Sequence, residues 1–198
     1  MSAKKGLIKM QVIALIGPKS SGKSTLAKAY LDKYRGKVII TSLAEPIKLM
    51  LGTFFSYQGE ENPDVIYQML YGDLKEQPTP YLNNQTPRHA METLGTEWRN
   101  LIDRDLWLAS WQRKAIHILT KSNKTVIVDD LRFQHEAKAV KNLEGHIIHI
   151  SREGCLPGLH PSESEYLQIK PDLIIFNTEN KPEQMLLQLE QYLERRKL

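Results

Sequence analysis

Gly17-Pro18-Lys19-Ser20-Ser21-Gly22-Lys23-Ser24-Thr25 is preceded by the apolar run Val12-Ile13-Ala14-Leu15-Ile16 and followed by Leu26-Ala27-Lys28-Ala29-Tyr30-Leu31, which suits a helix. The segment fits the pattern G-x-x-x-x-G-K-[ST], which is informative only between a strand and a helix. Both neighbours are of the required kind. A strand, a glycine-bearing loop and a helix in this order are typical of an α/β fold. The segment therefore predicts an α/β domain whose first loop is shaped to hold a polyphosphate.

Each residue type in this segment suits that task. Gly17 and Gly22 allow backbone turns that other residues avoid, so that consecutive N–H groups can face phosphate oxygens. The helix that follows adds the positive end of its dipole. Lys23 can reach the β- and γ-phosphates, and the Ser24 hydroxyl can complete a Mg²⁺ shell. A strand-to-helix turn without a ligand is the competing interpretation, and the lysine together with both flanks argues against it. The predicted ATP-binding residues here are Gly17, Lys19, Ser20, Ser21, Gly22, Lys23, Ser24 and Thr25.

Length and composition indicate one globular domain. The chain has 198 residues, of which 41% are hydrophobic and 25% charged, and these fractions exclude disordered and collagen-like proteins. No apolar run approaches the roughly 18 residues that span a bilayer, and the N-terminal residues lack a signal peptide's apolar segment. We therefore expect a cytoplasmic protein without a membrane partner. The single cysteine, Cys155, suits a reducing compartment, and nothing near it resembles a catalytic-thiol signature.

The net charge of +4 leaves two interpretations. A nucleic-acid-binding protein usually concentrates its Lys and Arg in one stripe, whereas here they are scattered, with the densest clusters at the two ends of the chain. A protein that binds several phosphates of a small anion needs only a few inward-facing cations. The placement of charge favours the small anion and disfavours polymeric nucleic acid.

Apolar runs rich in β-branched residues alternate with helical patterns, which predicts a parallel sheet covered by helices on both faces. The predicted strands are residues 11–16, 37–41, 125–128, 146–150 and 173–176. The segment between the second and third predicted strands is longer than a crossover connection needs. It has helical patterns around 47–55, 64–74, 87–102 and 106–121, which predict a substrate-binding insertion. We expect one domain over 1–198, with a core of 8–42, 122–151 and 172–198, a helical insertion over 43–121 and a lid over 152–171.

Two carboxylates, Asp129 and Asp130, follow the third predicted strand. The carboxyl ends of strands line the ligand crevice in open α/β sheets, where an Asp can hold Mg²⁺ directly or through water. The alternative is that one of them caps the helix expected from residue 133. With a phosphate loop upstream, we favour the metal role for at least one of the pair. Arg132 is expected to reach the same crevice.

Further arginines are candidates for phosphate clamps, because phosphoryl transfer demands positioned cations around both substrates. They are Arg88, Arg99, Arg104 and Arg152. Any one of them taken alone is more often an exposed or salt-bridged surface residue. Trp98 lies close enough in sequence to Arg99 to stack on a base, although packing in the core is its simpler role. His160 is a candidate to orient a phosphate or a lid carboxylate.

Several segments together resemble a family, the phage-type deoxynucleoside monophosphate kinases of the P-loop nucleoside monophosphate kinase group. The resemblance covers most of the chain, and the Gly-Thr-Glu-Trp and Asp-x-Arg-Phe segments are its most specific parts. Besides the phosphate loop, the shared segments are Ser42-Leu43-Ala44-Glu45-Pro46-Ile47-Lys48, Arg88 with Glu92-Thr93-Leu94-Gly95-Thr96-Glu97-Trp98-Arg99 and Asp105-Leu106-Trp107, Asp130-Leu131-Arg132-Phe133 with Glu136-Ala137, and His160-Pro161-Ser162-Glu163. The sequence departs from the family in having Arg99-Asn100 where a Gly-Arg pair is common, and Leu43 in place of an aromatic residue.

The resemblance implies a three-layer P-loop fold, a helical acceptor-binding insertion, a lid, and transfer of the γ-phosphoryl group from ATP to a deoxynucleoside monophosphate (dNMP) with Mg²⁺. The residue pattern and the resemblance together predict catalytic roles for Lys23, Asp130, Arg132 and Arg152 and metal binding by Ser24, Asp129 and Asp130. The resemblance alone implies a place for Asn177 near the donor adenine. The implied acceptor-binding residues are Ala44, Pro46, Lys48, Arg88, Thr96, Glu97, Trp98, Arg99, His160 and Glu163.

Three alternatives stay open at this point. The chain could be another P-loop small-molecule kinase, a kinase that acts on a modified base in DNA, or a P-loop regulatory ATPase that works by conformational change. A long helical insertion and a lid suit the exclusion of water better than they suit a switch protein. The sequence does not decide the preferred base, the choice between ribose and deoxyribose, the arginine that binds the acceptor phosphate, or whether the chain forms a homodimer. If it is phage-encoded, the host cytoplasm is the expected location.

Overall fold

The computed structural model describes residues 11–156, 165–178 and 181–196. The chain divides into two compact units, one formed by Met1–Ser42 with Gln112–Leu198 and the other by Leu43–Trp111. We call them the sheet unit and the helical unit. The sequence predicted a helical insertion over 43–121, whereas the helical unit ends at Trp111, within the helix α6 (Leu106–His117). That one domain combines both units as a kinase core and a substrate-binding insertion stays a prediction.

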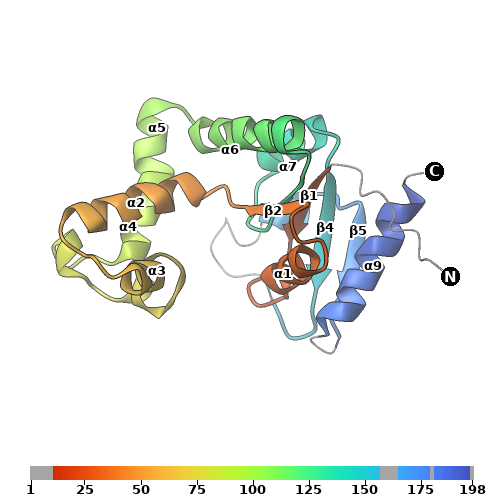
Figure 1. Ribbon diagram of the computed structural model, residues 1–198, viewed down its shortest axis with the longest axis horizontal. Helices are drawn as coiled ribbons and strands as arrows, with labels where there is room; N and C mark the ends of the chain where they lie inside the picture. The colour runs from red at the N-terminus through yellow and green to blue at the C-terminus, as the bar shows by residue number, and fades with distance from the viewer. Residues whose placement is uncertain (1–10, 157–164, 179–180, 197–198) are drawn as a thin grey trace. The chain divides into compact units, whose positions relative to one another are not determined.

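The sheet unit contains the predicted five-stranded parallel sheet (Figure 1). Its strands are β1 (Val12–Ile16), β2 (Val38–Thr41), β3 (Thr125–Val128), β4 (His146–Ser151) and β5 (Leu173–Phe176). Their order across the sheet is β2-β3-β1-β4-β5, and every neighbouring pair is parallel. The chain leaves β1 towards β2 but leaves β3 towards β4, in the opposite direction. Such a reversal is where open α/β sheets bind ligands, and the loop that carries Gly17 begins there.

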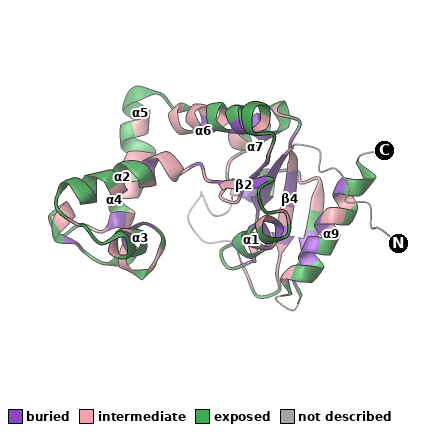
Figure 2. Ribbon diagram, in the orientation of Figure 1, coloured by how far each residue is buried: buried purple, intermediate pink, exposed green. Residues whose placement is uncertain are grey.

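Helices cover both faces of the sheet, as the apolar strand pattern requires. All five residues of β1 are buried, and Figure 2 shows burial concentrated in the central strands. The helices α1 (Lys23–Lys33) and α9 (Pro182–Arg195) pack on one face, and α7 (Gln134–Asn142) contacts β1 and β4. The core between α1, α9 and the sheet includes Leu26, Ile148 and Leu189. The sheet unit is therefore the predicted three-layer α/β core.

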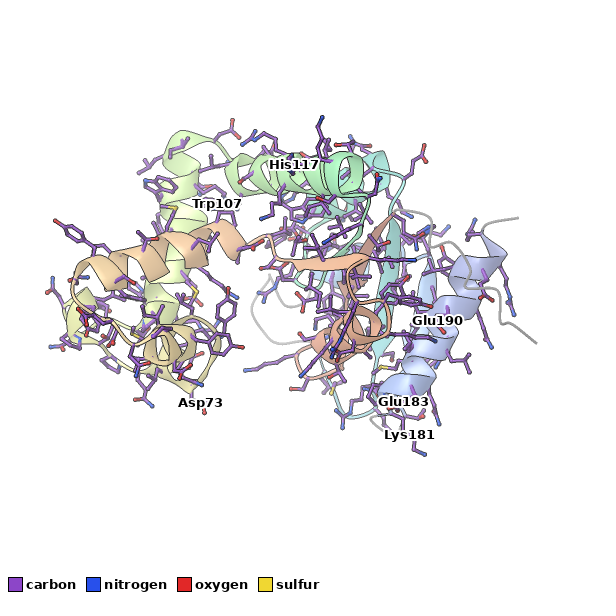
Figure 3. The ribbon with its side chains drawn as sticks, viewed as in Figure 1. Asp73, Trp107, His117, Lys181, Glu183 and Glu190 are labelled. Atoms are coloured by element: carbon purple, nitrogen blue, oxygen red, sulfur yellow. The ribbon has the colours of Figure 1, made fainter. Side chains whose placement is uncertain are left out.

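A polar cluster joins the C-terminal end of α1 to Glu190 within α9. The Tyr34 hydroxyl and the Lys33 ammonium donate to the carboxylate of Glu190 at 2.6 and 2.7 Å, and Figure 3 labels Glu190 on α9. Burial raises the pKa of the Tyr34 phenol, and the Glu190 carboxylate adds to the effect. Since α1 begins at the phosphate loop and α9 follows β5, the cluster helps to hold both elements beside the site.

The helical unit has a core of its own. Its elements are α2 (Glu45–Tyr57), α3 (Pro63–Tyr71), the 3-10 helices η1 (Asp73–Glu76) and η2 (Pro80–Leu82), α4 (Pro87–Thr93), the π-helix η3 (Leu94–Trp98), α5 (Arg99–Ile102) and the first part of α6. Phe55 and Leu51 of α2 are buried against Met69 and Leu70 of α3, and Trp107 packs against this cluster. The sheet unit adds a second π-helix, η4 (Ile118–Ser122), and a 3-10 helix, η5 (Glu165–Gln168).

The helical pattern over residues 87–102 is confirmed, since α4, η3 and α5 follow one another without a gap, and the structure adds that η3 is a wider π-turn within this stretch. The indole N–H of Trp107 donates to the carbonyl oxygen of Leu94 at 3.2 Å, so this carbonyl has a partner outside the helix. Single π-turns within helices are frequent at functional sites. Here the turn carries the Gly-Thr-Glu-Trp segment that the sequence analysis singled out.

Candidate active site

The phosphate loop is held in a conformation that depends on its glycines. Gly17 has φ 137° and Gly22 has φ 107°, values that side chains rarely allow. A Cβ on Gly17 would lie 2.4 Å from the carbonyl oxygen of Ile150, so β4 leaves no room for any side chain there. The loop encloses a hollow of about 170 Å³, lined by Ser20, Gly22, Lys23, Ser24, Thr25 and Arg152. This hollow has the polar groups and the cations that a chain of phosphates requires.

Lys23 lies over its own loop. Its ammonium donates to the carbonyl oxygens of Gly17 and Pro18, each at 2.7 Å. His149 on β4 lies close by, and burial together with the charge of Lys23 lowers the pKa of its imidazole. His149 is therefore held neutral beside the loop at physiological pH, where it adds no competing positive charge.

The two carboxylates after β3 have different partners. The Ser24 hydroxyl donates to Asp129 Oδ2 at 2.8 Å, whereas the Ser42 hydroxyl donates to Asp130 Oδ2 at 2.5 Å. The register of the sheet explains the first contact, because Ala14 of β1 pairs with Val128 of β3, so Asp129 follows β3 beside the strand that leads into the loop. Asp129 is thus joined to the phosphate loop, and Asp130 to the residue that follows β2.

The donor set formed by Ser24 and Asp129 fits Mg²⁺. This cation is usually held by one or two carboxylates with substrate phosphates and water, rather than by a cage of protein ligands. In the part of the chain that the structure describes, no group of three or more His, Cys, Asp or Glu side chains gathers as a metal centre. The Ser24 hydroxyl and the Asp129 carboxylate, already in contact beside the loop hollow, could supply the protein's part of such a shell.

Glu136 shapes the turn that carries Arg132. Its carboxylate accepts hydrogen bonds from the backbone N–H groups of Arg132 at 2.7 Å and Phe133 at 3.0 Å. Burial raises the pKa of Glu136 to about 7 despite these two hydrogen bonds, and the charge of Asp130 adds to the effect. Glu136 caps the first turn of α7, the role that the sequence analysis offered as the alternative for the aspartates.

Two more predicted residues contact the loop. Arg152, which follows β4, donates to the carbonyl oxygen of Ser20 at 3.2 Å. Asn177, which follows β5, is 2% exposed, and its side-chain nitrogen donates to the carbonyl oxygen of Ser21 at 2.8 Å. Residues that follow β3, β4 and β5 therefore all reach the loop that follows β1.

The predicted acceptor residues of the helical unit belong to three places within it. Ala44 and Pro46 begin α2, and the ammonium of Lys48 lies 4.1 Å from the ring centre of Tyr71 on α3. Arg88 on α4 forms an ion pair with Glu76, with 2.5 Å between Nη2 and Oε1.

Thr96, Glu97 and Trp98 lie on η3, and Arg99 begins α5. The ring of Trp98 lies 5.4 Å from that of Trp107, centre to centre, and Trp98 remains 36% exposed. The guanidinium of Arg99 donates to Asn100 Oδ1 at 3.0 and 3.2 Å.

Sequence comparison identifies the relatives of this site. The family model for deoxynucleotide monophosphate kinase matches residues 67–185. A protein of Acanthamoeba polyphaga mimivirus, provisionally described as a deoxynucleotide monophosphate kinase, is 30% identical over 183 residues, which cover 85% of this chain and 89% of the viral protein. The chain belongs to the deoxynucleotide monophosphate kinase family. It is a nucleotide kinase, and membership of this kinase family implies the use of ATP.

Solved structures with a similar chain trace include two kinases. A sugar kinase of Janibacter sp. HTCC2649 is 15% identical, with 93% of this chain and 95% of that chain covered and a TM-score of 0.45. A provisionally assigned kinase of Chloroflexus aurantiacus J-10-fl is 15% identical, with 96% and 99% covered and a TM-score of 0.47. Separately, none of the helices in the described ranges has the length and apolar character needed to span a bilayer.

In this deoxynucleotide monophosphate kinase family member, the structure brings the predicted loop residues together with Asp129, Arg152 and Asn177 in the sheet unit. The predicted acceptor residues from 44 to 99 lie in the helical unit. His160 and Glu163 lie outside the described residues. Arg132 is exposed and lies in the turn that Glu136 holds before α7. Its role in catalysis stays a prediction.

Sequence reasoning gave no role to three residues of this family member: Ser42, which contacts Asp130, Glu136, which holds the turn of Arg132, and His149, which lies beside the loop. Ser42 and Glu136 were quoted only as parts of family-like segments. Ser42 could have been found by the rule that applied to Asp129, since both directly follow a strand. His149 lies within β4 and carries no sequence signal of its own.

Proposed function

We propose that this nucleotide kinase transfers the γ-phosphoryl group of ATP to the 5′-phosphate of a dNMP. A phosphate oxygen of the dNMP forms the new bond to the γ-phosphorus as the bond from that phosphorus to the bridging oxygen breaks. The products are ADP and the deoxynucleoside diphosphate. The acceptor is already an anion, so the protein needs no general base, and its contribution is positioning and charge neutralisation.

The observation that carries the donor half of the proposal is the contact of Ser24 with Asp129 beside the loop hollow. Bound Mg²⁺ would neutralise charge on the β- and γ-phosphates, and Ser24 and Asp129 are the residues that would hold it. Asp130 supports the same edge through Ser42. Lys23 would move from its two carbonyl partners to the transferred phosphoryl group, and Arg152 would contact the donor phosphates from the rim of the hollow.

The ATP nucleoside has a place next to the phosphates. A groove of about 620 Å³ shares Ser24 and Thr25 with the loop hollow and continues along α1 and the start of α9. Ala29, Pro182 and Leu186 supply its apolar lining. Volumes of this order suit small-molecule ligands, and an apolar wall with polar ends suits a base and its sugar.

The acceptor half of the proposal assigns dNMP binding to the helical unit. Lys48, Arg88 and Arg99 supply cations for the acceptor phosphate, and the half-exposed ring of Trp98 offers a face for a base. The ion pair of Arg88 with Glu76 is exposed at both partners, so a phosphate can replace it at little cost. Thr96 and Glu97 lie next to each other on the π-turn and are proposed as polar contacts to the same acceptor.

The test is a coupled assay of ADP formation by the wild-type protein with ATP, Mg²⁺ and each of the four dNMPs. We expect ADP formation that depends on added dNMP, with a deoxynucleoside diphosphate as product. Formation of ADP without any acceptor would contradict the proposal and indicate an ATPase. Transfer only to duplex DNA that contains a modified base would also contradict the proposal and would indicate a kinase that acts on DNA.

A matched pair of variants tests the acceptor site. Arg99→Gln should raise the KM for dNMP by about tenfold or more while leaving the KM for ATP near that of the wild type, because a lost charged hydrogen bond is worth about 1.5–3 kcal/mol. Arg113→Gln removes an exposed arginine of α6 in the sheet unit and should change neither KM. Equal KM values for dNMP in the two variants would show that Arg99 does not bind the acceptor.

A further inference from the structure

We propose that Asn177 is a positioning residue that fixes one peptide group of the phosphate loop in its phosphate-binding orientation, rather than a contact to the donor base. The proposal rests on the proposed use of ATP as donor, and it adds a residue that acts through the loop. Its basis is the position of Asn177 after β5, with its side chain directed into the loop from 156 residues away in sequence.

The hydrogen bond of Asn177 leaves no choice of orientation. A carbonyl oxygen can only accept, so the group that faces Ser21 O at 2.8 Å must be the amide nitrogen. The backbone N–H of Asn177 donates to Ser151 O at 2.8 Å, which continues the pairing of β5 with β4. The side chain is therefore carried by the sheet itself, and with 2% exposure it does not offer a surface to a base.

Holding the Ser21 carbonyl also sets the next N–H group. The peptide between Ser21 and Gly22 is trans and planar, so its C=O and N–H point in opposite directions. With the carbonyl directed at Asn177, the N–H of Gly22 points away from Asn177, and Gly22 is among the residues that line the loop hollow. The hydrogen bond thus presents a backbone donor to the phosphates.

The loop and Asn177 are fitted to each other. A Cβ on Gly22 would lie 2.6 Å from the Asn177 side-chain nitrogen, so a glycine is needed here for closeness as well as for its φ of 107°. Within the described residues, the Asn177 oxygen and the Ser21 hydroxyl oxygen are buried without a hydrogen-bond partner. Burying a polar side chain whose oxygen has no partner costs free energy, so the hydrogen bond from its nitrogen to Ser21 O is what offsets this cost among the described contacts.

The experiment compares the affinities of the full chain for ATP and for inorganic tripolyphosphate, which has the phosphates but no base, by calorimetry. Asn177→Asp keeps the side-chain size but places an acceptor against the Ser21 carbonyl. We expect it to weaken the binding of both ligands by the same factor, about tenfold or more, because one buried donor is replaced by a repelling group. The KM for the acceptor should stay within about twofold of the wild-type value.

Ile175→Val is the matched control, since it alters a fully buried side chain two residues earlier on β5 and leaves the Asn177 side chain unchanged. It should lower the melting temperature and leave both affinities unchanged. Should Asn177→Asp fail to fold, Asn177→Ala, which leaves the Ser21 carbonyl without its donor, is compared in the same way. Unchanged affinity for tripolyphosphate in the folded Asn177 variant overturns the proposal, and a loss confined to ATP does so as well by indicating a base contact. Failure of the kinase proposal is seen separately, as absence of dNMP-dependent ADP formation by the wild type.

Discussion

Replacing Lys23 by methionine should separate the binding of ATP from the transfer step. In the structure the ammonium already makes two charged hydrogen bonds of 2.7 Å, to Gly17 O and Pro18 O. Each such hydrogen bond contributes about 1.5–3 kcal/mol. When ATP binds, Lys23 exchanges these two hydrogen bonds for contacts of similar strength to the phosphates. The net gain on binding ATP is therefore small, and Lys23→Met should weaken ATP binding by less than about tenfold.

The transition state is different, because charge develops on the bridging and transferred oxygens. These oxygens then attract the Lys23 ammonium more strongly than the two loop carbonyls do. Loss of one donor that stabilises charge in a transition state costs on the order of 10²–10³ in kcat. Calorimetry for ATP affinity and the coupled assay for turnover measure the two quantities, with Lys138→Met, an exposed lysine of α7, as control. A loss of ATP affinity of a hundredfold with kcat retained would refute the reasoning.

Three further predictions concern the surroundings of the loop. Asp129→Asn should raise the Mg²⁺ concentration needed for half-maximal activity more than Asp130→Asn does, because Asp129 contacts Ser24; the reverse order in a Mg²⁺ titration would assign the metal to Asp130. Glu136 binds a proton up to about pH 7 in the folded chain but only to its ordinary 4.5 when unfolded, so its stabilising contribution is lost as the pH rises through this window. Relative to Glu136→Gln, the wild-type unfolding free energy should therefore fall by at most about 3 kcal/mol between pH 4.5 and 7.5, and denaturant titrations showing a rise would contradict the sign. Gly17→Ala should lower the melting temperature and abolish tripolyphosphate binding, since its Cβ would lie 2.4 Å from Ile150 O, and a normally stable, ligand-binding variant would show that the loop can shift.

The strands could be predicted nearly to the residue, because buried parallel strands leave a continuous apolar run in the sequence. The runs at 125–128 and 173–176 have the observed bounds, and the other three differ by one residue at one end. In the insertion the helical stretch 87–102 also has the observed bounds, but its π-turn was not predicted. The pattern over 87–102 shows which side chains are apolar, whereas a π-turn depends on the backbone carbonyl that each N–H group bonds to, and this choice has no signal in the order of apolar residues.

The candidate site likewise has features that could be predicted from the sequence and others that could not. The phosphate loop is local in sequence, so its pattern was enough to predict its place and its glycines. The partners of its residues are not local: Ser24 contacts Asp129 across 105 positions and Asn177 contacts Ser21 across 156. The order of the strands in the sheet decides which strand ends lie side by side, and this order cannot be read from the sequence. For the same reason the raised pKa of Glu136, which comes from burial, has no signal in the sequence.

The distribution of tryptophan gives the protein a built-in spectroscopic label. The chain has three tryptophans, at positions 98, 107 and 111, and all of them belong to the helical unit. Trp98 is 36% exposed and Trp111 only 2%, so their emission differs in sensitivity to solvent. Fluorescence excited at the red edge of the indole band therefore reports on one unit alone, whereas circular dichroism reports on both. Chemical unfolding followed by the two signals would show directly, from whether the curves coincide, whether the helical unit and the sheet unit melt as one cooperative structure.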